Sequence, residues 1–296
     1  MKIKKNIRVH NALPDGVDAL MINSGTVHHS HHKAALVTYL DEEFIPEYVD
    51  YAYVNKRDWR PLTEEEIACL APDEEANDHN TVYLGEIPEE LKACFQEMGL
   101  QHSEDRDEVF DRFEANPALT MRTSELLNEF LTPFANDKPF KFHCIGVNYP
   151  NVELVASNTT MLPKNFKQAE KKFLGMHNDG TQLMTIETAH EFGNRISINL
   201  GKDTRYFLFV NLSMKEAHAM LKEKLGDEEI ANVNIANIPQ YFFKHFPDYP
   251  VIRIAQKPYQ YYIAATDNFF HDGSTLGGTH LDVCIVYFGS FQPVKN

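Results

Sequence analysis

The spacing of apolar side chains changes in character along the chain. Between Ile87 and Phe134, apolar residues recur every three or four positions, which is typical of amphipathic helices. We expect about three helices in this stretch. A shorter acidic run at residues 63–70 predicts another helix, which leads into an exposed loop.

After Pro139 the pattern becomes one of β-branched and aromatic runs in which apolar and polar positions alternate. Alternation with a period of two is typical of half-buried strands. The runs that show it are KFHCIGVNY, VELVAS, TQLMTIET, RISINL, RYFLFVNL, PVIRIA, YQYYIAA and HLDVCIVYF. Eight short strands that are separated by turn residues predict a β-sandwich or a jelly roll.

One helix and one insertion interrupt the predicted strands. Ser213 and Glu216 have the spacing of a capping box, and Gly226 marks the end of that helix. Residues 227–249 then predict an insertion that covers one mouth of a barrel. We expect a single domain over residues 1–296, with a mixed helical portion at 1–139 and a β core at 140–296 that carries this insertion.

Charge and cysteine content restrict the class of protein. The 296 residues include 43 acidic and 28 basic side chains, which gives a formal net charge of −15. Such a field repels a polyphosphate backbone, so we expect no nucleic-acid partner. Four widely spaced cysteines predict free thiols in a reducing compartment. Without a recognisable secretory signal or apolar span, we expect a cytoplasmic protein with no membrane partner.

The sharpest chemical motif is Gly175-Met-His-Asn-Asp-Gly180. On a strand, residues two apart point to the same side, so His177 and Asp179 can reach one metal ion there, whereas on a helix they cannot. The flanking glycines disfavour a helix. Two ligands still require a third from elsewhere in the fold. Taken alone the pair is weak evidence, because a hydrogen-bonded structural pair has the same spacing.

The segment at residues 261–275, which contains His271, is followed by a strand-like run at 280–291. This order of HxD motif, long insert, late histidine and final strand resembles the iron(II)/2-oxoglutarate-dependent dioxygenase superfamily over residues 175–291. The resemblance implies a mainly β fold with flanking helices and a double-stranded β-helix core, a cupin-like jelly roll. It also implies Fe(II) bound by His177, Asp179 and His271. In that superfamily the late histidine ends the penultimate strand, and the alternatives to His271 are His280, His190 and His218.

The resemblance further implies a basic residue for the distal carboxylate of 2-oxoglutarate. Many members carry an arginine on the last strand, about ten residues after the late histidine. This chain departs from that pattern, because apart from His280 only Lys295 is basic after His271.

Two arginines on strands that follow the HxD motif remain candidates for this role, Arg195 and Arg205, with Arg253 a lesser one. Arg195 alternates with apolar positions and so shares the polar side of its strand with Ser197. It can bind an anion only if that side faces the barrel interior.

These observations predict an oxygenase that uses dioxygen to hydroxylate a small molecule, such as an amino acid or a natural-product intermediate, or to desaturate or cyclise it. Asp179 favours this chemistry, since halogenating relatives carry a small residue there. A cupin-type metal enzyme without 2-oxoglutarate stays open because the C-terminal arginine is missing, as does a non-catalytic β-sandwich binding protein. The tract His28–His32 is a rival metal site, for which a solvated loop is the ordinary alternative.

Overall fold

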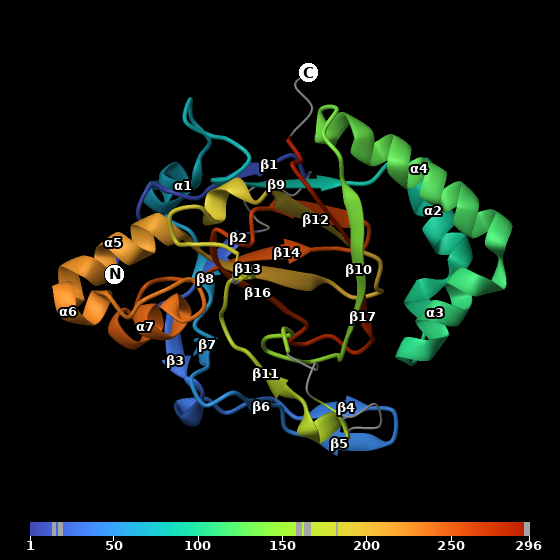
Figure 1. Cartoon of the computed structure of the whole chain (residues 1–296). Coiled ribbons are helices and arrows are strands. Elements are labelled where there is room, and N and C mark those ends of the chain that lie inside the picture. The colour runs from blue at the N-terminus through green and yellow to red at the C-terminus, as the bar shows by residue number, and fades with distance from the viewer. Residues whose placement is uncertain (14–15, 17–19, 158–161, 163–166, 182, 293–296) are drawn as a thin grey trace.

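The computed structural model describes the chain apart from residues 14–15, 17–19, 158–161, 163–166, 182 and 293–296. Two sheets form the centre of the molecule (Figure 1). The larger sheet has the order β1 (Arg8–Asn11), β9 (Thr81–Glu86), β15 (Gln260–Ala264), β12 (Asn194–Asn199), β17 (Asp282–Gly289) and β10 (Lys141–Asn148). The smaller sheet has the order β16 (Phe269–Ser274), β13 (Arg205–Ser213), β14 (Ile252–Gln256), β2 (Leu20–Ile22) and β8 (Arg60–Pro61).

The C-terminal strands are divided between the two sheets. In the larger sheet β10, β17, β12 and β15 are antiparallel neighbours, and in the smaller sheet β16, β13 and β14 are. The extended backbone at His177 adds a fourth element by pairing with His271 of β16. Followed along the chain, this order is that of a double-stranded β-helix, and the predicted jelly-roll core is confirmed.

The polar side of β12 faces the interior between the sheets. Ser197 accepts a hydrogen bond from Arg205 of the opposite sheet, and Asn199 donates one to the Gln256 carbonyl of β14. The alternate residues Ile196 and Ile198 are fully buried on the outer side, in one apolar cluster with side chains of the helices. Arg195 lies on the same side of β12, so it faces the barrel interior, as binding of an anion by this residue would require.

Three helices cover the outer face of the larger sheet, as the sequence predicted. They are α2 (Glu89–Met98), α3 (Arg106–Ala115) and α4 (Pro117–Ala135), which lie on one side of the molecule in Figure 1. Their apolar side chains, such as Phe95 and Leu131, pack into the cluster beneath them. Helix α1 (Glu64–Leu70) begins at the capping box that Thr63 and Glu66 form. None of the helices in the described part of the chain is long and apolar enough to cross a membrane.

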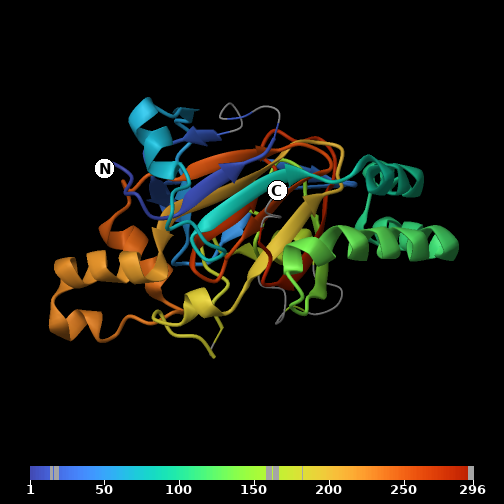
Figure 2. The same ribbon diagram turned by 90° about the horizontal axis from the view of Figure 1, so that it is seen from above.

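The predicted insertion is helical and lies at the opposite end of the molecule from α2–α4 (Figures 1 and 2). Helix α5 (Met214–Leu225) begins at Ser213, which accepts a hydrogen bond from the Glu216 amide, and ends before Gly226. The insertion itself forms α6 (Asp227–Ile230) and α7 (Ile238–His245). Phe242 and Phe243 of α7 are buried against Phe270 of β16. This packing fixes the insertion beside the strand that carries His271.

The N-terminal portion contributes strands as well as helices. β1 and β9 extend the larger sheet, and β2 and β8 extend the smaller one. Three two-stranded pairs complete it, β3 (Thr26–His28) with β7 (Tyr53–Asn55), β4 (Val37–Tyr39) with β5 (Glu42–Phe44), and β6 (Glu47–Tyr48) with β11 (Lys172–Phe173). The N-terminal portion is thus built into both walls of the barrel. All four cysteines are free, as expected.

Two of the predicted strands are wrong, and β16, β11 and the strands before Pro139 were not predicted. Residues 152–157 form no regular strand, because the amides of Val155 and Ala156 bond to the Asp272 side chain. The described residues of 181–188 form turns, in which the Thr185 and Thr188 hydroxyls accept hydrogen bonds from backbone amides. β16 is not among the predicted runs, and its pairing with β13 holds it extended.

Candidate metal centre

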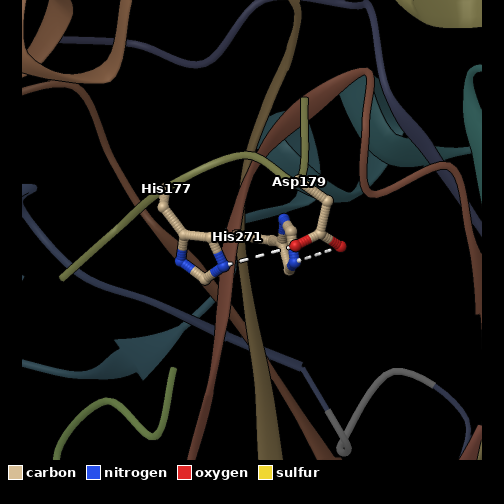
Figure 3. Close-up of side chains that lie close together, drawn as sticks. All are labelled: His177, Asp179 and His271. Atoms are coloured by element: carbon tan, nitrogen blue, oxygen red, sulfur yellow. Dashed lines mark ion pairs between the residues drawn. The ribbon is translucent and has the colours of Figure 1, made fainter. Parts of the chain in front are cut away.

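The side chains of His177, Asp179 and His271 converge at one end of the barrel (Figure 3). The Nε2 atoms of His177 and His271 lie 3.6 and 3.5 Å from different carboxylate oxygens of Asp179. One ligand atom from each residue can be chosen so that all three lie within 4.8 Å of one another, and no other such group occurs in the described chain. The separations of 3.6 and 3.5 Å are below the ~4.2 Å that two atoms can span when each lies about 2.1 Å from one metal ion.

Backbone pairing positions this triad. His177 and His271 exchange backbone hydrogen bonds of 3.2 and 2.7 Å, so their imidazoles project from paired residues and their ring centroids lie 4.7 Å apart. The Asp179 amide donates to the carbonyl of Thr266 over 3.3 Å. The expected strand geometry therefore holds at His177 but not at Asp179, which lies beyond the bridge. His271 is the third residue of β16 rather than its last, which corrects that detail of the sequence analysis.

The buried carboxylate of Asp272 lies close to the imidazole of His177. The Nδ1 atom of His177 lies 3.0 Å from the Gly175 carbonyl oxygen and 3.6 Å from Oδ2 of Asp272. Oδ1 of Asp272 accepts hydrogen bonds from backbone amides of β16 and the 152–156 segment. A partner on Nδ1 orients the ring and leaves Nε2 as the donor to a metal.

Arg195 lies between Asp179 and a second buried carboxylate, that of Asp267. Nη1 of Arg195 lies 3.5 Å from Asp179 and 3.2 Å from Asp267, and it donates to the Thr266 hydroxyl over 2.6 Å. Burial alone raises the pKa of Asp179, but the charges of His271, His177 and Arg195 outweigh burial and hold that pKa well below its usual range. Asp179 is therefore ionised and placed by its neighbours, as a metal-binding carboxylate must be.

The pKa of His177 responds to the same carboxylates. Burial lowers this pKa, but Asp179 and Asp272 more than offset burial and raise it to about 10. A cation that replaces this proton meets the same two carboxylates, since they stabilise positive charge at this position. The donor set of two imidazoles and one carboxylate is the facial triad that suits Fe(II) with open coordination positions.

Arg205 is buried in the barrel interior. It shares the interior side of β13 with Phe207, whose ring lies 6.0 Å from that of His271. Its Nε lies 3.1 Å from Asp282, and its Nη1 donates to Ser197. A Cβ on Gly273 would lie 2.8 Å from Nη2 of Arg205, so the glycine leaves room for the guanidinium. Arg205 thus places a buried positive charge in the barrel interior.

Other candidates from the sequence lie elsewhere. His280 is half-exposed and pairs with Asp203, and His190 stacks edge-on against His79. His218 belongs to helix α5, and Arg253 lies between the rings of Trp59 and Tyr206. Lys295 falls outside the described residues.

The tract His28–His32 does not assemble a metal-binding group among the described residues. Its members make ordinary structural contacts. Nε2 of His28 lies 2.9 Å from the Asp50 carbonyl oxygen, and Nε2 of His32 lies 3.3 Å from the buried Glu153. This is a partly packed loop and short helical turn rather than a rival site.

A cavity of about 170 Å³ opens beside His177, between the HxD segment and the insertion. Tyr53, Phe243 and Gln240 line it. These residues were not connected with His177 from the sequence, because nothing in it brings such distant segments together.

No protein-family model and no curated protein matches the sequence. Two solved structures are similar to the chain, and both are of the Kdo hydroxylase KdoO, described as a non-heme Fe(II) α-ketoglutarate-dependent dioxygenase. The apo form has 13% identity and a TM-score of 0.38 over 73% of this chain and 81% of that chain. The cobalt(II) complex has 13% identity and a TM-score of 0.37 over 73% and 82%. The likeness is distant.

Proposed function

We propose that this chain is an Fe(II)- and 2-oxoglutarate-dependent oxygenase that hydroxylates a small molecule. The observation that carries the proposal is the convergence of His177, Asp179 and His271, from two separate segments of a double-stranded β-helix, on one point beside a cavity. Two imidazoles and one carboxylate hold Fe(II) on one face and leave the other face for cosubstrate, substrate and dioxygen. The fit is chemical as well as geometric, because Asp179 is ionised.

When the metal and cosubstrate are bound, the overall reaction converts 2-oxoglutarate, dioxygen and a substrate C–H into succinate, carbon dioxide and an alcohol. One oxygen atom enters succinate and the other enters the product. Desaturation or cyclisation is the finer alternative outcome at the same site.

Of the two candidate arginines, we assign Arg205 to the distal carboxylate of 2-oxoglutarate. Arg195 already faces two carboxylates, those of Asp179 and Asp267, whereas Arg205 faces one, that of Asp282. Asp282 also accepts a hydrogen bond from Asn148, so Arg205 is not its sole partner. A buried anion needs a cation that is not fully neutralised, and Arg205 meets this condition better.

Arg195 then has a positioning role. It connects the buried Asp267 to Asp179 and so holds the carboxylate that is expected to bind the metal. Asp272 does the same for His177. The phenyl rings of Phe207 and Phe269 lie within 6.2 Å of the His271 ring and help to exclude water from this end of the barrel.

The remaining assignments follow from composition. We propose that the chain acts as one domain, and that it works in the cytoplasm, since its cysteines are free. The net charge of −15 supports a small-molecule substrate over a nucleic acid. A cupin-type enzyme without 2-oxoglutarate is the second candidate, favoured by the absence of an arginine from the described part of the last strand.

Anaerobic titration of the metal-free protein with Fe(II) and then 2-oxoglutarate tests the proposal. A weak visible charge-transfer band should appear only when both are present, and His177→Ala should abolish it. If wild-type protein binds Fe(II) but shows neither the band nor 2-oxoglutarate binding by calorimetry, the second candidate replaces the first. If His177→Ala binds metal like wild type, the site itself is wrong.

A further inference from the structure

The cavity beside His177 has a lining of unusual composition for the entrance to a polar catalytic site. Three aromatic side chains, Tyr51, Tyr53 and Phe243, share it with aliphatic groups such as Met176 and Ile235. Among the described lining residues none is an acid, an arginine or a lysine, and His177 is the single one that can carry a positive charge. The lining offers apolar surface and neutral polar groups.

A charged group of a ligand would meet no acid, arginine or lysine among the described lining residues of this cavity. Burying an unpaired carboxylate or ammonium is costly, which disfavours a free amino acid or an organic acid here. The ring nitrogens of His177 already face the carboxylates of Asp179 and Asp272, each 3.6 Å from one of them.

The aromatic side chains form one wall rather than a cage. The rings of Tyr53 and Phe243 have centroids 5.9 Å apart and planes 31° apart, so they do not enclose a point from several sides. An aromatic cage for a cation needs several ring faces directed at one centre. This arrangement suits a flat or cyclic group that packs along the wall.

The neutral polar groups of the cavity differ in availability. The Asn178 amide is occupied when its nitrogen donates to Ile235 O over 3.3 Å and its oxygen accepts from Gly180 N over 3.2 Å. The side-chain amide of Gln240 makes no hydrogen bond to another described residue and is half-buried at the cavity. Gln240 is therefore free to bind a hydroxyl or carbonyl of a ligand.

The size and position of the cavity limit the group that enters. Its volume of about 170 Å³ corresponds to roughly six waters at ~30 Å³ each, which is enough for one six-membered ring with a short substituent. Tyr51 is 48% exposed at the same cavity. The remainder of a larger substrate can therefore extend past Tyr51 into solvent, while the ring lies against His177.

We propose that this cavity binds an uncharged ring of the substrate, packed along Tyr53 and Phe243 and hydrogen-bonded by Gln240, with a C–H bond presented to the metal beside His177. The inference rests on the proposed function, because it takes this cavity as the place where the substrate reacts. It replaces the earlier expectation of a free amino acid with an uncharged cyclic molecule.

Three probes of the same shape and different charge test the binding class: benzyl alcohol, benzoate and benzylammonium. Chemical-shift titration of the metal-free protein should show millimolar binding of benzyl alcohol at the cavity. The two charged probes should bind at least tenfold more weakly, a difference of about 1.4 kcal/mol. Tighter binding of either charged probe, equal binding of all three, or no binding of any would overturn the proposal.

A comparison of two variants, each of which adds one positive charge, controls for the effect of net charge on binding. Gln240→Lys should strengthen benzoate binding at least tenfold and weaken that of benzyl alcohol, because it places a cation in the cavity. Gln96→Lys adds the same charge on exposed α2, on the far side of the molecule, and should change neither. An equal effect of both variants would mean that net charge, not the cavity, determines binding.

The last step separates this inference from the proposed function. In anaerobic protein with Fe(II) and 2-oxoglutarate, benzyl alcohol should shift the charge-transfer band. A band that forms but does not respond to bound benzyl alcohol would refute the placement of the ring beside the metal. If no band forms, the oxygenase proposal fails while selective binding of benzyl alcohol to the metal-free protein still stands.

Discussion

His177 and His271 lie 94 positions apart in the sequence, yet their backbones bond to each other in both directions, over 3.2 and 2.7 Å. This single bridge sets the separation of the two imidazoles, because each projects from a residue that the other holds in register. The candidate metal centre is therefore formed by strand pairing, and Asp179 follows His177 two residues later.

The identity of the third ligand can be tested by comparing two histidines. His271→Ala should lower Fe(II) affinity at least a hundredfold, since it removes one of three ligands. His280→Ala should leave it unchanged, because that half-exposed side chain pairs with Asp203. Calorimetric titration of both variants measures this. Retained Fe(II) binding in His271→Ala would exclude that residue as a ligand.

The two arginines should give different phenotypes. Arg205→Gln is expected to raise the dissociation constant for 2-oxoglutarate at least tenfold with little change in Fe(II) affinity. Arg195→Gln should instead weaken Fe(II) binding, since Arg195 contacts Asp179. Because Arg205→Gln leaves Asp282 buried without its cation, the double variant Arg205→Gln/Asp282→Asn serves as the folded control. Interchanged phenotypes would reverse the assignment.

Asp272→Asn should lower Fe(II) affinity about 10–100-fold. The amide oxygen of asparagine can still accept from the backbone amides that now bond Oδ1, so the fold is kept. The NH₂ group of the asparagine would, however, lie opposite the Nδ1–H of His177. Two donors would then face each other, and the imidazole would lose its carboxylate partner. Asp203→Asn, at a surface carboxylate, is the matched control. Equal affinities in the two variants would argue against a positioning role.

Gly175 and Gly277 provide a test of local packing at the motif. Both have positive φ, +77° and +84°, but a Cβ on Gly175 would lie 2.7 Å from Tyr53 O, whereas one on Gly277 meets nothing within 4 Å. Gly277→Ala should cost about 1–2 kcal/mol of unfolding free energy from backbone strain alone. Gly175→Ala should cost about 2–4 kcal/mol, since overpacking adds to strain. Urea unfolding compares them, and an equal cost would show that Tyr53 moves freely.

The acid sensitivity of helix α1 depends on Glu66. The Arg60 side chain, with the Thr63 amide, outweighs burial and lowers the pKa of Glu66 to about 2. A folded pKa below the ordinary value means that Glu66 stabilises the fold above about pH 4.5 and loses this effect as the pH falls toward 2. Glu66→Gln should therefore cost about 1 kcal/mol at pH 7 and almost nothing near pH 2.

Urea unfolding at both pH values measures this difference. Glu65→Gln is the control, because Glu65 and its partner Lys2 are both largely exposed and their ion pair contributes little. A constant cost of Glu66→Gln across this pH range would mean that its role is not electrostatic.

Several elements were predictable from the sequence because local rules determine them. The period-two alternation of β12 and β13 and the three- to four-residue spacing in α2 and α4 reflect which side of each element is buried. The caps at Thr63 and Ser213 depend on residues three positions apart. That His177 and Asp179 lie close together was likewise predicted from their separation of two residues, although Asp179 lies beyond the paired backbone.

Tertiary structure decided what depends on residues far apart in sequence. β16 was not among the predicted strand runs, and it is extended because β13 pairs with it. The roles of Arg195 and Arg205 could not be separated by pattern, since both lie on interior sides of strands and differ in the carboxylates that other strands bring to them. The cavity beside His177 combines side chains of β7, the HxD segment and α7. A sequence pattern reports which side of an element is buried, but not which distant side chains share that interior.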